Sequence, residues 1–180
     1  MLKVYVPNRE FYDEKANRFF TTKATTLQLE HSLLSLSKWE SYWCKPFLDK
    51  KEKTPEEMLD YIRCMTINKE VDPNVYYALS TDEIKTIFQY VERPMTATWF
   101  SDDKRGRMSR EIITSEIIYY WMIALKIPFE CQKWHLNRLL TLIKVCSIKE
   151  QPPKKMGKKA IYQQNRAINA AHRRAHNSKG

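Results

Sequence analysis

Two helix-start signals, each followed by apolar residues at helical spacing, constrain this sequence most. Residues 54–57 (TPEE) and 80–83 (STDE) both place a hydroxyl three positions before a glutamate. In such a capping box the two side chains satisfy backbone N–H groups at the start of a helix, and proline is favoured at the first helical position. The apolar residues that follow recur at i, i+3, i+4 and i+7: Met58, Tyr61, Ile62 and Met65, then Ile84, Ile87, Phe88 and Val91. The pattern predicts two amphipathic helices, and only 3 glycines in 180 residues argue against a loop-rich all-β fold.

The first 30 residues instead have the period of two that is typical of short strands. Apolar and polar side chains alternate over residues 2–6 and 26–30, and residues 19–22 are aromatic or β-branched. Residues 7–17 are polar and charged and predict a linker. The expected class is mainly α (α+β): a short N-terminal β-hairpin or small sheet, about five packed helices that begin near residue 32, and a basic C-terminal tail.

Two more helices are expected before the tail. Ser109 is a candidate cap for a helix over about 110–125, whose second half, 117–125, is apolar nearly all round and predicts the central buried helix. A last helix over about 129–147, after Pro128, carries an apolar stripe: Leu136, Leu139, Leu140, Ile143 and Cys146.

The net charge of +10 is unevenly distributed. Residues 150–180 hold eight basic residues and one acid, for +7, whereas the other 149 residues hold 23 basic and 20 acidic residues, for +3. Pro152-Pro153 marks a linker. We therefore expect a helical globular domain with N-terminal strands over 1–149 and a flexible or helical basic tail over 150–180. The tail's candidate partner-binding residues are Lys154, Lys155, Lys158, Lys159, Arg166, Arg173 and Arg174.

Three interpretations of the tail stay open. It binds nucleic acid through counterion release, or docks on an acidic protein, or only keeps the chain soluble. It contains one aromatic residue, Tyr162, which disfavours sequence-specific RNA recognition.

A second candidate partner surface lies in a predicted loop. Trp99 and Phe100 precede the basic residues Lys104, Arg105 and Arg107. Exposed aromatic side chains there would suit a partner. The equal alternative is that the loop folds back and Trp99 fills a gap in the core.

The sequence favours a protein without catalytic, cofactor or metal sites. Cys131 and His135 stand four residues apart, as two ligands on one helix face would, but no second pair completes a metal site, and a buried cysteine beside a partly buried histidine is the stronger interpretation. The four cysteines fit no zinc spacing and are expected as mostly buried thiols. No signal peptide opens the chain, and the longest apolar run has nine residues, too few to cross a bilayer.

Three segments carry a resemblance to a known family. They are residues 27–48 (LQLEHSLLSLSKWESYWCKPFL), 94–100 (PMTATWF) and 110–146 (REIITSEIIYYWMIALKIPFECQKWHLNRLLTLIKVC), and the basic end over 167–180 adds to them. The chain resembles tail assembly chaperones of long-tailed bacteriophages over nearly its full length.

The resemblance implies a non-catalytic protein in the cytoplasm of an infected bacterium. Such chaperones keep the tape-measure protein soluble until tail-tube subunits polymerise around it, so these two proteins are the implied partners, with a homo-oligomer open. Two alternatives remain: a nucleic-acid-binding accessory protein that uses the tail, and a structural head–tail connector.

Overall fold

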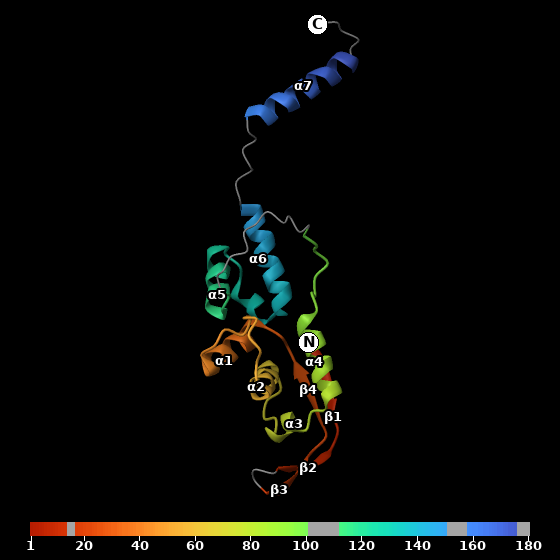
Figure 1. Cartoon of the computed structure of the whole chain (residues 1–180), viewed down its shortest axis with the longest axis vertical. Helices are drawn as coiled ribbons and strands as arrows, with labels where there is room; N and C mark the ends of the chain where they lie inside the picture. The colour runs from red at the N-terminus through yellow and green to blue at the C-terminus, as the bar shows by residue number, and fades with distance from the viewer. Residues whose placement is uncertain (14–16, 101–111, 151–157, 176–180) are drawn as a thin grey trace. The chain divides into compact units, whose positions relative to one another are not determined.

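The structure is a computed structural model that describes residues 1–13, 17–100, 112–150 and 158–175 (Figure 1). It confirms the α+β class: the described part has small antiparallel pairings near the N-terminus and is otherwise helical. The chain divides into two compact units, Met1–Cys146 and Ser147–Gly180. The strands are β1 (Leu2–Val6), β2 (Arg9–Asp13), β3 (Arg18–Thr22) and β4 (Thr25–Leu29). The helices are α1 (Leu33–Trp43), α2 (Pro55–Met65), α3 (Asn74–Tyr77), α4 (Thr81–Glu92), α5 (Ser115–Ala124), the 3₁₀ turn η1 (Phe129–Lys133), α6 (Leu136–Glu150) and α7 (Lys158–Ala175).

The four strands form two antiparallel pairs, β1 with β4 and β2 with β3. Val4 lies opposite Leu27, and both are buried, as the alternation predicts. The expectation of a linker over 7–17 is wrong for residues 9–13, because these residues form β2 and pair with β3. The charged Arg9 is tolerated in β2 because its guanidinium donates to Glu83, at the start of α4, and to the Ala78 carbonyl. Glu83 lies 74 positions after Arg9, so the sequence around Arg9 gives no indication of this contact.

Both predicted capping boxes are present. The Thr54 hydroxyl accepts from the Glu57 N–H at 3.2 Å, and Glu57 accepts from the Thr54 N–H at 2.8 Å. Ser80 and Glu83 repeat this exchange at the start of α4. These bonds satisfy N–H groups that have no partner within the helix, and so they fix where α2 and α4 begin.

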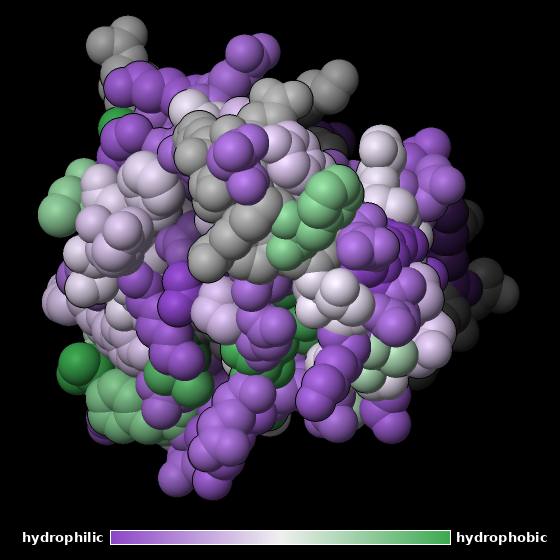
Figure 2. Space-filling model, turned by 90° about the horizontal axis from the view of Figure 1, so that it is seen from below, coloured by the Kyte–Doolittle hydropathy of each residue, from purple (hydrophilic) through white to green (hydrophobic). Residues whose placement is uncertain are grey.

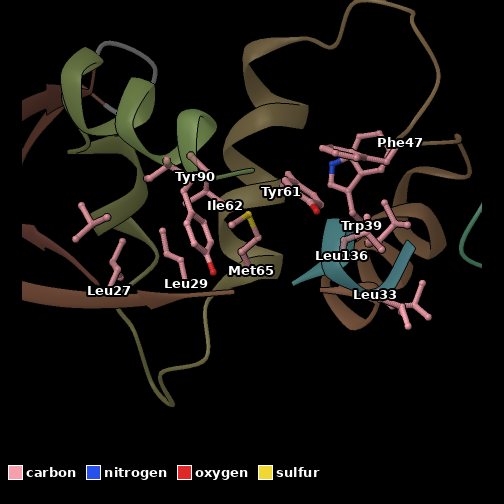
Figure 3. Packing of buried hydrophobic residues seen from close by; sticks show 14 of the residues in the cluster. Leu27, Leu29, Leu33, Trp39, Phe47, Tyr61, Ile62, Met65, Tyr90 and Leu136 are labelled. Carbon is pink, nitrogen blue, oxygen red and sulfur yellow. The ribbon is translucent and has the colours of Figure 1, made fainter. Parts of the chain in front are cut away.

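The core of the first unit lies where β4, α1, α2, α4 and α6 meet, and Figure 3 shows most of its large side chains. Trp39 and Tyr61 are fully buried, and the Trp39 indole N–H donates to the Glu57 carbonyl at 2.8 Å. Phe47 stacks on Tyr61 with ring centroids 3.7 Å apart. The other labelled core residues are Leu27, Leu29, Leu33, Ile62, Met65, Tyr90 and Leu136.

Residues 30–32, which we call the 30–32 junction, connect the last strand to α1 and bond to three other helices. The Glu30 N–H donates to the Met65 carbonyl of α2 at 2.9 Å, and the Tyr90 hydroxyl of α4 donates to the Glu30 carboxylate at 2.7 Å. The His31 carbonyl accepts from the Leu136 N–H of α6 at 2.7 Å. The junction therefore sets the positions of α2, α4 and α6 relative to the strands.

The buried carboxylate of Glu40 holds two distant segments against α1. One oxygen accepts from the Phe47 N–H at 2.9 Å, and the other accepts from the Ser115 N–H at 2.7 Å. Ser115 is the first residue of α5, where N–H groups lack helical partners and a negative charge is favoured. Glu40 thus fixes where α5 begins.

Two helix boundaries differ from the sequence prediction. The helix expected over 110–125 begins at Ser115, because Thr114 is extended and Ser115 bonds to Glu40; Ser109 lies outside the described residues. The helix expected over 129–147 begins at Leu136. Phe129–Lys133 forms the 3₁₀ turn, and Trp134 is extended where the backbone of His135 bridges to Ser32.

The expectation that residues 117–125 form the central buried helix is also wrong. Only Ser115, Ile118 and Met122 of α5 are buried, whereas Tyr120 and Ile123 are exposed. The most deeply buried elements are instead β4, α1 and α2.

We predict that Glu40→Ala lowers the free energy of unfolding by roughly 3 kcal/mol, because two buried N–H groups lose their acceptor. Glu40→Gln, which keeps one acceptor oxygen, should lose about half as much. The exposed Glu92→Ala should stay within about 0.5 kcal/mol of the wild type. Urea unfolding followed by tryptophan fluorescence measures the stability of all three variants. Equal stabilities for Glu40→Ala and Glu92→Ala would show that the Glu40 carboxylate does not stabilise the fold.

Candidate interaction surfaces

A groove lies among α1, α2 and α3, which we call the α1–α3 groove. Its volume is about 310 Å³. The side chains that line it are mostly aromatic or charged: Tyr42, Trp43, Glu56, Leu59, Asp60, Arg63, Pro73, Tyr76 and Tyr77. In Figure 1 the three helices are neighbours in the lower part of the first unit.

Fixed hydrogen bonds hold two of the aromatic rings in this groove. The Trp43 indole N–H donates to an Asp60 oxygen at 2.9 Å, and the Tyr76 hydroxyl donates to the Thr66 hydroxyl at 3.0 Å. Burial raises the pKa of the Tyr76 phenol, which therefore stays neutral. Tyr42 and Tyr77, by contrast, are 74% and 67% exposed. The groove thus has a rigid aromatic floor and two exposed rings that a partner could cover.

Charges of both signs lie along the α2 side of the groove. Glu56, Asp60 and Arg63 come from successive turns of this helix. Within the described part of the chain, the Glu56 carboxylate accepts no hydrogen bond and forms no ion pair. Aromatic rings and charged groups therefore lie side by side in the described lining of the groove.

A second surface is the outer side of α5, formed by Tyr120, Ile123 and Ala124 and called here the α5 face. All three side chains are exposed, and Glu116 is the charged residue at its N-terminal end. Because residues 117–125 are all apolar, whichever side of this helix turns away from the core must present apolar side chains to water. The face shown in Figure 2 is mostly hydrophilic, with green in small separate groups.

The structure decides between the alternatives for Trp99, which is 87% exposed and does not fill the core. Phe100 is half-buried, and the Lys144 ammonium lies 4.1 Å from the centre of its ring. Lys104, Arg105 and Arg107 lie outside the described residues, so the predicted basic part of this surface has no structural description.

Part of the basic tail is a helix. Arg166, Arg173 and Arg174 are exposed on α7, and Lys158 and Lys159 are its first residues. Lys154 and Lys155 lie outside the described residues. From 158 to 175 the sequence contains no Asp or Glu, so the positive charge of the helix has no compensation along its length.

Cys131 and His135 do not share a helix face, which corrects the basis of the metal candidate. The 3₁₀ turn ends before Trp134, and His135 precedes α6. In the described ranges no three His, Cys, Asp or Glu side chains are grouped to hold a metal ion.

The free thiols are also less buried than expected: Cys131 is buried, whereas Cys44 is exposed.

His135 instead forms a buried pair with His31, their ring centroids 5.0 Å apart. Nε2 of His135 donates to the Tyr90 carbonyl at 3.1 Å, and Nδ1 of His31 is hydrogen-bonded to the Tyr61 hydroxyl. Burial and, to a smaller extent, the neighbouring His135 together lower the pKa of His31 to about 3. Burial also lowers the pKa of His135, against the opposing effects of the Tyr90 carbonyl and Glu30. Both rings are therefore neutral at pH 7.

Comparison with protein-family models, with curated proteins and with solved structures finds no match for this chain. No helix in the described ranges has the length and apolarity needed to cross a membrane.

We predict that the histidine pair makes stability fall with acidity. Their folded-state pKa values are depressed below the unfolded value of about 6.5, so the unfolded chain takes up protons first as the pH falls below that value. The free energy of unfolding should decrease by roughly 3 kcal/mol between about pH 7 and pH 4. Urea unfolding as a function of pH measures this. His31→Gln should flatten the curve, and an equally steep curve in that variant would contradict the assignment.

Proposed function

We propose that this protein is a non-catalytic phage tail assembly chaperone that binds the tape-measure protein through the α5 face. The observation that carries the proposal is the pair of exposed apolar side chains, Tyr120 and Ile123, on a helix whose other side is fixed in the core by Ile118 and Met122. A rigid apolar helix face is suited to pair with an apolar stripe on another helix.

A surface of this kind suits the task of covering apolar stripes on a tape-measure helix. A long tape-measure helix exposes apolar stripes that would otherwise associate with one another in water. One face on each chaperone covers only a short stretch of such a helix, so many copies are needed and each contact is weak. Weak contacts allow the copies to leave as tail-tube subunits take their place.

A second candidate function, nucleic-acid binding through the tail, has a specific observation in its favour. Arg166, Arg173 and Arg174 are exposed on a helix that contains no acidic residue. Such a helix would neutralise phosphates and release counterions, so binding would weaken steeply with salt. Deleting residues 150–180 should abolish this binding, and binding that survives the deletion would exclude the tail as its source.

We predict that co-expression with a phage tape-measure protein increases the soluble yield of that protein and that the two co-purify. Ile123→Asp should reduce the soluble tape-measure protein by about fivefold, since a charge is placed in the apolar contact. Quantitative immunoblotting of soluble and pellet fractions measures the effect.

The matched control is Ile67→Asp. Ile67 is exposed to a similar extent, 53% against 62% for Ile123, but it lies after α2 and not on the α5 face. It should leave the soluble yield unchanged. Equal yields with Ile123→Asp and with the wild type would exclude the α5 face as the binding surface.

A further inference from the structure

The α1–α3 groove has the chemistry of a site for cationic side chains. Four aromatic rings line it, from Tyr42, Trp43, Tyr76 and Tyr77. The face of an aromatic ring carries partial negative charge and attracts an ammonium or guanidinium group placed over it. Two of these rings are mostly exposed, so a cation could reach them without displacing the core.

The carboxylates of the groove favour the same occupant. Glu56 is exposed and, among the described residues, is neither hydrogen-bonded nor paired with a cation. One oxygen of the Asp60 carboxylate accepts from the Trp43 indole N–H at 2.9 Å. Arg63 is the opposing charge in the lining, so the groove holds two carboxylates and one guanidinium.

The chain itself contains a segment of complementary chemistry, the helix α7. Tyr162, Arg166 and Arg173 lie at i, i+4 and i+11, which places them along one side of a helix. The two arginines are separated by about 10 Å along the axis, at 1.5 Å per residue. All three side chains are exposed, and the helix has no acidic residue. Arginine suits aromatic sites particularly well, because its planar and weakly hydrated guanidinium stacks on rings.

We propose that the α1–α3 groove of one copy binds the helix α7 of a second copy, with Arg166 or Arg173 over the tyrosine rings and beside Glu56. The contact is heterologous, because the groove and the helix are different surfaces of the same chain. It therefore links copies into pairs that exchange tails or into longer assemblies. This self-association requires no tape-measure protein and does not depend on the proposed function.

Sedimentation equilibrium of the full-length, nuclease-treated protein at low salt tests the proposal. The wild type should associate as its concentration rises. Glu56→Lys should weaken association by about tenfold, because a cation replaces the carboxylate beside the rings. Arg63→Ala should strengthen it by about threefold, because the repelling cation is gone. Arg166→Glu/Arg173→Glu should abolish it, and combining these two changes with Glu56→Lys should restore part of it.

Asp82→Lys is the matched control for Glu56→Lys. Both acids are exposed at the second position of a capping-box helix, but Asp82 begins α4 and is not part of the groove lining. The control should associate as the wild type does, and circular dichroism should show all variants folded. A wild type that remains monomeric at every concentration would overturn the proposal. Association that depends on Arg166 and Arg173 but is unchanged by Glu56→Lys and Arg63→Ala would also overturn it, since the tail would then bind elsewhere.

Discussion

The first unit depends on hydrogen bonds made by two consecutive residues, Glu30 and His31, at the point where the strands end and the helices begin. Glu30 and His31 are bonded to Met65, Tyr90 and Leu136, which belong to three different helices. Buried polar groups must find partners, so each of these bonds restricts where its helix can lie. Apolar packing supplies the driving force for burial, but it is not directional. The 30–32 junction supplies the direction, and the buried pair of His31 and His135 lies in the same region with both rings neutral.

The sequence predicts those parts of the fold whose cause is local. Thr54 with Glu57 and Ser80 with Glu83 fix the starts of two helices, and alternation identifies β1 and β4. The sequence-based predictions are wrong where a hydrogen-bond partner far along the chain determines the local structure. Arg9 belongs to a strand because Glu83 accepts its hydrogen bonds, and α5 begins at Ser115 because Glu40 accepts from its N–H. No periodicity within the segment can reveal such bonds.

The candidate surfaces show the same division between local pattern and tertiary context. The sequence identifies Trp99 and the basic tail, because an aromatic residue in a loop and a cluster of charge are visible in the chain alone. The α1–α3 groove was not predicted from the sequence, although the adjacent aromatic pairs Tyr42-Trp43 and Tyr76-Tyr77 could have indicated an aromatic surface. Adjacent side chains on a helix point about 100° apart. In each of these two pairs one ring is held by a hydrogen bond in the groove and the other is exposed. Residues 117–125 are all apolar, so any exposed side of α5 must be apolar. The structure shows which side this is, because Tyr120 and Ile123 are exposed.

The bonds made by Glu40 also bear on how the protein folds while it is being synthesised. Its second acceptor bond goes to a residue 75 positions later in the chain. Until the ribosome has released that residue, burying the carboxylate would leave one of its oxygens without a donor. Closing the core of the strands, α1 and α2 before α5 is synthesised would therefore cost about 1–3 kcal/mol for the unpaired oxygen, which favours closure after residue 115 has been made. Contacts so distant in sequence also slow folding after release, because a long loop must close before they form. Fragments that end before α5 lack the Ser115 N–H that completes the environment of Glu40, so they should be less stable than the complete first unit.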